Sequence, residues 1–324
     1  MNHFPTAPLS DSSKALFNTN IGRWLRAFPP EKERTLEWLV RHPKKAMKCL
    51  RQTDTVKNTP KNHHCFLSAV VAYVRHEVKD NDLIMTWVKI RNENAAPIRE
   101  EADSGEPTKL QKGKEMPWAD ILKVRDALPL SATKLLLAMY TYIPPIRADL
   151  FACRLYEETP DEVGEDNYIV LDEKNPRLVL QDYKTKKTYG ALQIPLPKPL
   201  YVMIRQCIKE GICKGEYLFT DTFDLPYDRH GFSKQSGRML ARAFGKPMTL
   251  TAIRHNFTSK IDSNLPVKEL KIFAEPMGHS LVMQRMYKWD ELSDKNEIVQ
   301  RNFTKIDIPL VITEKDVSIL KNVR

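Results

Sequence analysis

The chain has 324 residues, 42% of them hydrophobic and 28% charged, which suits two domains, each with a buried core. The net charge of +10 favours a polyanionic partner, either nucleic acid or an acidic membrane surface. Five cysteines without a Cys-x-x-Cys pair argue against a disulfide framework and a structural zinc site. Residues 1–13 contain no secretory signal, and no apolar run approaches the ~20 residues of a membrane helix. We therefore expect a soluble, intracellular protein without a bound metal.

The first region, residues 1–95, is predicted to be helical and basic. Apolar residues recur at helical spacing in three stretches: Leu16, Trp24, Leu25 and Phe28 before a Pro29-Pro30 stop; Leu36, Leu39 and Val40; and Cys65, Leu67, Val70, Val71 and Val74. This region has 16 Lys and Arg against 9 Asp and Glu, a net charge of +7. Most of the excess charge therefore lies here. Residues 96–115 mix Gly, Pro, Lys and Glu, which predicts a linker.

The second region, residues 116–290, is predicted to contain helices on both sides of a small sheet. One helix begins near Trp118, and another ends before Pro144-Pro145. Short β-type runs follow at 168–171, 178–180 and 192–194, and the lysine-rich segment 184–190 would form the turn of the last hairpin. Further helices are predicted at 199–211, 232–244, 250–261, 267–275 and 281–289. The fold class is thus mainly α with a small antiparallel sheet (α+β), followed by a tail of mixed character at 291–324.

The second region also carries residues suited to cutting a phosphodiester bond without metal. That reaction needs a nucleophile, cations for the non-bridging oxygens and an acid for the leaving oxygen. Arginine suits the oxygens because it stays charged and offers a planar fork of donors. The candidates occur in this order: Arg147 in Ile143-Pro-Pro-Ile-Arg-Ala-Asp149, Lys184 in the hairpin, Thr251 and Arg254 in Thr-Ala-Ile-Arg-His255, His279 after Gly278, and Tyr287.

These motifs, in this order, resemble those of the tyrosine recombinase family, which includes phage and viral integrases. The family pattern is Arg, a hairpin Lys, His-x-x-Arg, Gly-His or Gly-Trp, and a Tyr eight or nine residues later. Gly278-His279 followed by Tyr287 is similar to the last part. The Pro-Pro-x-Arg-x-Asp block looks closest to integrases of large DNA viruses and related mobile elements. The resemblance covers residues 116–290, and the basic helical region before it is similar in character to the family's core-binding domain.

The resemblance implies a role for each candidate residue. Arg147 and Arg254 would hold the scissile phosphate, and His279 would hydrogen-bond one of its oxygens. Lys184 would protonate the 5′ leaving oxygen, although Lys186 and Lys187 in the same turn are alternatives. Tyr287 would attack to form a 3′-phosphotyrosyl link, with no metal, ATP or other cofactor. Rejoining would be the reverse step with the 5′ hydroxyl of another strand.

One residue departs from the family pattern. Thr251 stands where the family usually has the histidine of His-x-x-Arg. Threonine cannot act as a base near neutral pH, although its hydroxyl can hydrogen-bond. Either the proton of Tyr287 goes elsewhere, or the step is slower in this chain. The neighbouring His255 is a poor substitute, because adjacent residues on a helix point about 100° apart.

Three functions are compatible with these residues. The leading hypothesis is a site-specific DNA recombinase or integrase whose two domains hold duplex DNA, with no membrane or small-molecule substrate involved. By resemblance it would act as a homotetramer on two DNA sites, in the cytoplasm or nucleus, with the tail at 291–324 contacting a neighbouring protomer. A type IB topoisomerase is the first alternative, but Met283-Gln-Arg-Met-Tyr287 lacks that group's Ser-Lys-x-x-Tyr signature. The second is a DNA-binding protein that has lost its activity, which Thr251 would favour.

Overall fold

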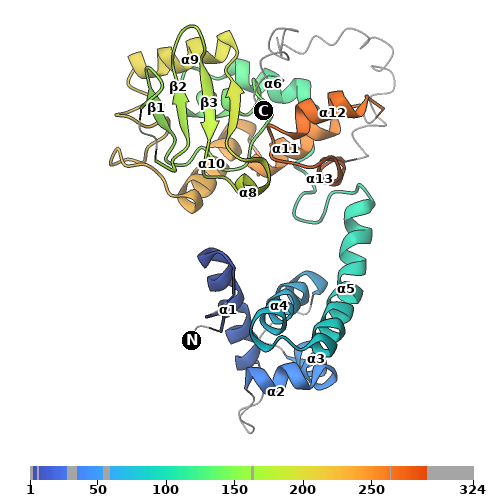
Figure 1. The fold of residues 1–324 in the computed structure, drawn as a ribbon. Coiled ribbons are helices and arrows are strands. Elements are labelled where there is room, and N and C mark those ends of the chain that lie inside the picture. Colours follow the sequence, from blue (N-terminus) through green and yellow to red (C-terminus); the bar gives the residue numbers. More distant parts are fainter. Residues whose placement is uncertain are drawn as a thin grey trace. The chain divides into compact units, whose positions relative to one another are not determined.

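The chain forms two compact units that divide after Ser104 (Figure 1). The structure is a computed structural model and describes residues 3–5, 7–27, 35–53, 59–161, 164–262 and 264–289. The predicted Pro29-Pro30 helix stop and the tail at 291–324 lie outside the described residues. Each unit is described by itself below.

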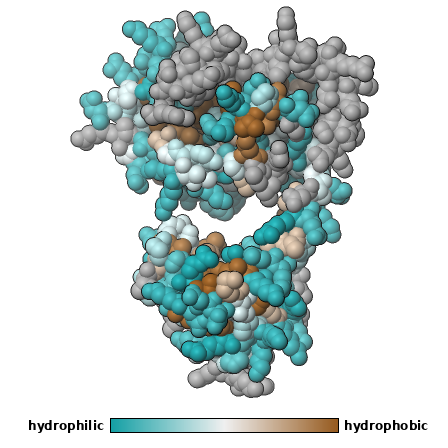
Figure 2. Space-filling view, turned by 45° about the vertical axis from the view of Figure 1, so that its right-hand side comes forward, coloured by the Kyte–Doolittle hydropathy of each residue, from teal (hydrophilic) through white to brown (hydrophobic). Residues whose placement is uncertain are grey.

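The first unit is helical, as the apolar spacing predicts. Its helices are α1 (Asp11–Arg26), α2 (Leu36–Arg41), α3 (Pro43–Gln52), α4 (Pro60–Tyr73), a π-helical turn at Val74–Val78, and α5 (Asn81–Asp103). The side chains of Ser10, Thr35, Thr59 and Asp80 cap helix starts by accepting a hydrogen bond from the backbone three residues on. Trp24 lies within the core, and its ring centroid is 5.9 Å from that of Phe66 and 6.1 Å from that of Trp87. Hydrophilic residues cover most of the visible face of this unit in Figure 2, around a smaller hydrophobic area.

The range predicted to be a linker differs in structure at its two ends. Helix α5 continues to Asp103 with Pro97 inside it, so residues 96–103 are helical. Arg99, Glu100 and Glu101 favour a helix, and glycine first interrupts the pattern at Gly105, whose φ is +65°. Residues 111–116 are hydrogen-bonded to the second unit: the Asn256 side chain binds Lys114 O at 3.0 Å and Met116 N at 2.9 Å. The two units divide within the range predicted to be a linker, while residues 96–103 continue α5 and residues 111–116 pack as part of the second unit.

The second unit combines a small sheet with helices before and after it. In chain order its elements are α6 (Trp118–Ala127), α7 (Ala132–Met139), β1 (Arg154–Tyr156), β2 (Tyr168–Val170), β3 (Arg177–Leu180), α8 (Lys186–Tyr189), β4 (Leu192–Pro195), α9 (Lys198–Lys209), α10 (Arg229–Phe244), α11 (Leu250–Ser259), α12 (Val267–Ala274) and α13 (Leu281–Met286). Figure 1 shows α11, α12 and α13 grouped together beside the sheet. One apolar core, which includes Leu136, Ile169, Leu200 and Ile253, joins the sheet to α7, α9 and α11.

The sheet has four strands in the order β1-β2-β3-β4. Strands β2, β3 and β4 pair antiparallel, with Ile169 opposite Leu178 and Leu178 opposite Ile194. Strand β1 pairs parallel with β2, with Leu155 opposite Ile169. The predicted α+β class and the three predicted strands are confirmed. The sequence did not reveal β1, because a strand of three half-buried residues leaves no alternating pattern.

The hairpin predicted around the lysine-rich segment is confirmed, since β3 and β4 pair antiparallel, and their connection contains the short helix α8 at residues 186–189. After Pro145 the chain turns: residues 148–152 form turns that lead to β1, and Ala152 takes a positive φ of 44°. The hydroxyl of Tyr140 donates a hydrogen bond to Arg147 O, and Asn167 donates one to Asp149 O at 2.7 Å. These tertiary bonds satisfy backbone carbonyls that a helix would otherwise have used.

Candidate active site around Tyr287

The candidate residues meet around α11, a helix that is buried on nearly every side. Thr249 caps its first turn, and each residue from Ala252 to Ser259 is buried. Arg254 in its middle is only 1% exposed. The guanidinium donates to Pro145 O at 2.6 Å, to Met277 O at 3.2 Å and to the Nε2 atom of His279. Helix α11 therefore draws together the turn before Arg147 and the Gly278-His279 segment.

Arg254 is a buried cation without a carboxylate in direct contact. Its three acceptors are two backbone carbonyls and a neutral imidazole, and its Nε–H has no partner among the described residues. Burial lowers the pKa of Arg254 to about 10; the nearby Tyr287 opposes this fall, and the charge of Arg147 contributes to it. A group with this pKa still carries its proton at neutral pH. A buried positive charge with a free donor is an environment that favours binding of an anion.

His279 supplies a second free donor at the same place. It is 2% exposed, and its backbone N–H binds Ala274 O at 2.9 Å. Burial, with the charges of Arg254 and Arg147, lowers the pKa of His279 to about 3, so the ring is neutral. Since Nε2 accepts from Arg254, the ring proton lies on Nδ1, which has no partner within the described part of the chain. The two free N–H groups, on Arg254 and His279, thus belong to directly bonded side chains.

Tyr287 lies next to both of these side chains. It follows the last residue of α13 in a turn, and its backbone N–H binds Gln284 O at 3.1 Å. The half-buried ring has its centroid 4.5 Å from that of His279 and 5.3 Å from the Arg254 guanidinium carbon. Tyr287, Arg254 and His279 therefore form one contact group, although Tyr287 is 33 residues from Arg254 in sequence.

Arg147 reaches this group across Gly278. Gly278 has a φ of +63°, and a Cβ atom there would lie 2.8 Å from Thr185 Oγ1 and 3.3 Å from an Arg147 nitrogen. Both the conformation and the close approach require glycine at this position. The glycine of the Gly-His motif thus allows the Arg147 side chain to lie against the segment that carries His279.

The lysine hairpin is fixed to the same segment through its threonine. Thr185 donates its hydroxyl to Gly278 O at 3.2 Å, and the Tyr183 hydroxyl donates to Gly190 O at 2.7 Å. Lys184, between these two anchored residues, is exposed and free to reach a ligand on the surface. Lys186 lies 3.8 Å from Glu165, whereas no ion pair of Lys184 occurs among the described residues. The two lysines therefore differ in exposure and in ion pairing, and both are next to the anchored Thr185.

Thr251 and His255 lie differently from the expectation. Thr251 is exposed near the start of α11 and makes no side-chain hydrogen bond within the described residues. His255 is instead the residue in contact with Tyr287: the two rings stack at 4.5 Å, and the other face of His255 stacks on Trp289 at 4.6 Å. Spacing on one helix could not reveal this contact. Because α11 is enclosed on several sides, residues about 100° apart both meet the 279–289 segment.

His255 has both ring nitrogens occupied. The Nδ1 atom lies 2.7 Å from Tyr287 O, and Nε2 lies 2.9 Å from Gln111 Nε2. Nδ1–H therefore donates to the carbonyl and Nε2 accepts from the amide. Burial lowers the pKa of His255 to about 4. The ring is thus a neutral positioning group that holds the backbone of Tyr287, not a free base.

A second polar network supports the turn that bears Arg147. Asp149, which is 2% exposed, accepts from Arg229 at 2.5 Å, and Arg229 also lies 3.4 Å from Asp182. Asn167 donates to the backbone carbonyls of Asp149 and Asp182 at 2.7 and 2.8 Å. Burial raises the pKa of Asp149, and the Arg229 cation opposes that rise. This network links the Arg147 turn to the start of the lysine hairpin and to the first residue of α10.

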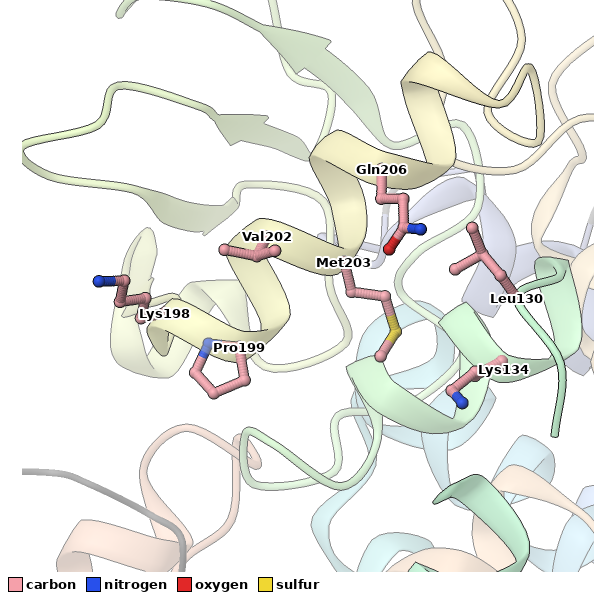
Figure 3. Close-up of a pocket in the computed structure, with 7 residues that line it drawn as sticks. All are labelled: Leu130, Lys134, Lys198, Pro199, Val202, Met203 and Gln206. Atoms are coloured by element: carbon pink, nitrogen blue, oxygen red, sulfur yellow. The ribbon is translucent and has the colours of Figure 1, made fainter. Parts of the chain in front are cut away.

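The candidate site is separate from the pocket between α7 and α9 (Figure 3). That pocket has a volume of about 620 Å³. Its lining residues are Leu130, Lys134, Lys198, Pro199, Val202, Met203 and Gln206. Lys134 is occupied there, since its ammonium donates to Leu128 O at 2.6 Å and Asp126 O at 3.2 Å. The pocket therefore contains none of the candidate residues.

The described residues contain neither a metal-binding cluster nor a membrane-spanning helix. No group of three or more His, Cys, Asp or Glu side chains in the described part of the chain could hold a metal ion. Within the same residues, no helix is both long enough and apolar enough to cross a membrane.

Solved structures that are similar to this chain include tyrosine recombinases and integrases. The XerA recombinase shares 10% identity at a TM-score of 0.42, covering 91% of this chain and 94% of its own. A lambda integrase dimer bound to a COC′ core site shares 16% identity at a TM-score of 0.48, and the match covers 88% of this chain and 73% of the integrase. The Tn1549 transposon integrase in complex with transposon right end DNA shares 14% identity at a TM-score of 0.43, and the match covers 90% of this chain and 95% of the integrase. No family model and no curated protein matches the sequence.

Proposed function

We propose that this chain is a DNA strand transferase, a site-specific recombinase or integrase, in which Tyr287 is the nucleophile. The observation that carries the proposal is the contact group of Tyr287, Arg254 and His279, with two buried N–H donors that lack a partner among the described residues. A phosphodiester has non-bridging oxygens that can accept both hydrogen bonds, and its negative charge would offset the buried charge of Arg254. A hydroxyl nucleophile beside such donors suits attack on phosphorus.

The proposed step forms one bond and breaks another. Tyr287 Oη attacks phosphorus, the bond from phosphorus to the 5′ oxygen breaks, and a 3′-phosphotyrosyl link and a 5′ hydroxyl result. Arg147 and Arg254 hold the non-bridging oxygens, His279 donates through Nδ1, and Lys184 protonates the leaving oxygen. The phosphate stays bonded to the protein, so that the 5′ hydroxyl of another strand can reverse the step without ATP.

The tyrosine proton requires a different acceptor from the histidine of the family pattern. Thr251 is not a base, and His255 has no free nitrogen. We propose that a phosphate oxygen or water takes this proton, and that Thr251 only hydrogen-bonds the bound strand. Consequently, cleavage would be slower than with a histidine at residue 251, and Thr251→His would accelerate it.

The proposed partner is double-stranded DNA. The exposed Lys184 and the half-buried Tyr287 suit a large ligand that lies on the surface. The basic helical unit would supply further phosphate contacts, which would make the affinity depend on salt. Exchange between two duplexes would require four protomers, as the sequence resemblance implies.

Trapping the covalent intermediate tests the proposal. The protein is incubated in EDTA with nicked duplexes that carry the DNA flanking its own gene, and a denaturant-resistant adduct is mapped by peptide sequencing. Tyr287→Phe is the test variant. Tyr217→Phe, whose ring lies 5.0 Å from Arg154 away from the site, is the matched control.

We expect a 3′-linked adduct on Tyr287 in the wild type and the Tyr217 variant, and none in Tyr287→Phe. A preference for particular duplexes would favour a recombinase, whereas equal reaction with every duplex and relaxation of supercoils would favour a topoisomerase. Salt-dependent DNA binding without an adduct on any duplex would contradict the proposed chemistry and leave an inactive DNA-binding protein.

A further inference from the structure

Helix α10 exposes a row of basic side chains. His230, Lys234, Arg238 and Arg242 are all exposed and lie four residues apart. At 3.6 residues per turn and 1.5 Å per residue, each step turns by about 40°, so the row winds by about 120° around the helix over roughly 18 Å. None of the four forms an ion pair within the described residues, and the sequence has no Asp or Glu between Arg229 and Ile261. The row is therefore a concentrated positive charge without an internal partner.

Small residues accompany this basic row. Ser233, Gly237 and Ala241 also lie four residues apart, each directly before a basic residue. A glycine in the middle of a helix lowers its stability relative to alanine. A Cβ atom at Gly237 would meet no atom within 4 Å, so packing inside the chain does not require glycine there. The small residues would let a bulky ligand approach the helix backbone beside the cations.

The basic row begins beside the candidate active site. Arg229, the first residue of α10, binds Asp149, two residues after Arg147, and lies 3.4 Å from Asp182, two residues before Lys184. A polyanion whose phosphate is held by Arg147 and Arg254 could therefore extend onto α10. A duplex carries one charge per ~1.7 Å of its axis, so several phosphates would fall within the length of the row.

We propose that α10 binds the phosphate backbone of the duplex next to the cleaved phosphodiester. This inference rests on the proposed function, since it takes DNA as the polymer held at Tyr287. It assigns phosphate contacts to His230, Lys234, Arg238 and Arg242, and to Gly237 the role of permitting close approach.

Salt-dependent binding of a fluorescent 30-base-pair duplex tests the assignment. The test variant is Lys234→Gln with Arg238→Gln, and the matched control is Lys198→Gln with Lys209→Gln, which removes two exposed lysines from α9. Loss of two phosphate contacts should lower the slope of log K against log salt by about 1.8 and weaken binding about tenfold or more near 0.1 M salt. The control should keep the wild-type slope.

Gly237→Leu provides a test in which misfolding cannot imitate the expected result. Leucine favours a helix over glycine, so the melting temperature should stay equal or rise, while binding weakens at least severalfold because the side chain blocks the approach. A binding loss together with a lower melting temperature would contradict this role of Gly237.

The outcomes separate this inference from the proposed function. An unchanged slope in the α10 variant, with the Tyr287 adduct still formed by the wild type, would overturn the inference alone. A reduced slope would support it even if no adduct formed, in which case the proposed strand transfer would fail by itself. Binding of the wild type to anionic phosphatidylserine vesicles but not to the duplex would overturn both.

Discussion

The two units differ most in what they bury. Among the described residues of the first unit, Asn20 and His63 are the only buried polar side chains, and tryptophans fill the core. In the second unit, buried polar groups include Arg254, His255 and His279. An apolar core stabilises through area removed from water, whereas a buried charge or imidazole lowers stability unless it is paired.

The second unit therefore contains more of the buried polar groups that lower folding stability when they are not paired. The first unit has a continuous apolar interior, and it too buries side-chain nitrogens without a partner among the described residues, on Trp24, His63 and His64. In the second unit, Arg254 Nε and His279 Nδ1 have no partner among the described residues, and both side chains contact Tyr287. The polar burial of this unit is therefore concentrated around α11, at the candidate site. Four changes would break or sharpen this contrast, from the largest expected effect to the smallest.

Trp24→Ala should lower the unfolding free energy of the first unit by about 3–5 kcal/mol, because it opens a cavity between Phe66 and Trp87. Chemical denaturation of the full chain would measure the loss of unfolding free energy. Hydrogen exchange would show in which unit the protection falls. We expect the protection of α11 in the second unit to remain. Equal loss of protection in both units would mean that they unfold together and that the contrast does not hold.

Acid should destabilise the second unit through His255 and His279. Their pKa values in the folded chain are about 4 and about 3, below the ordinary value of 6.5. Between these values and 6.5 the unfolded chain binds more protons, so stability is full above pH ~6.5 and falls as the pH drops. Between pH 7 and 5 the loss should be about 4 kcal/mol.

Urea unfolding of wild type and His279→Gln at both pH values would measure this effect. Burial also lowers the pKa of His63 and His64 in the first unit, so the difference between the two proteins is the informative quantity. His279→Gln should remove about half of the second unit's pH dependence. An identical pH dependence in both proteins would show that His279 is not held neutral.

Arg254→Lys should slow adduct formation about 10²-fold or more, because a lysine cannot serve the two carbonyls, His279 and a phosphate at once. Single-turnover cleavage of a nicked duplex would measure the rate. The matched control is Arg205→Lys, which retains its charge opposite Glu157 away from the site. A rate within twofold of the wild type would remove Arg254 from the proposed chemistry.

Gly278→Ala should lower the unfolding free energy by about 1–3 kcal/mol, since alanine disfavours a φ of +63° and its Cβ would press on Thr185. Thermal unfolding would show the loss. Gly245→Ala, also at a φ of +63° but with open space around the added Cβ, separates backbone strain from crowding. Equal losses in the two variants would mean that the contact with Arg147 and Thr185 is unimportant.

The sequence alone predicted most elements and the identity of the candidate group. Helices α9 to α13 and strands β2 to β4 follow from local periodicity and from proline and glycine stops, which are properties of neighbouring residues. The candidate residues could be named because each chemical step requires a particular type of side chain. Arg254, His279 and Tyr287, taken from motifs far apart, do lie in contact.

Only the tertiary structure decided how those residues are held. The stacking of His255 on Tyr287, its bond to Gln111 and the contact of Gly278 with Thr185 join residues between 32 and 144 positions apart or depend on a close approach. A local sequence pattern cannot predict such pairs, because it depends only on neighbouring residues and these partners are distant in sequence. The packing around α11 likewise buries Arg254 Nε and His279 Nδ1 without a partner among the described residues. This burial depends on residues from several helices and cannot be read from the motifs alone.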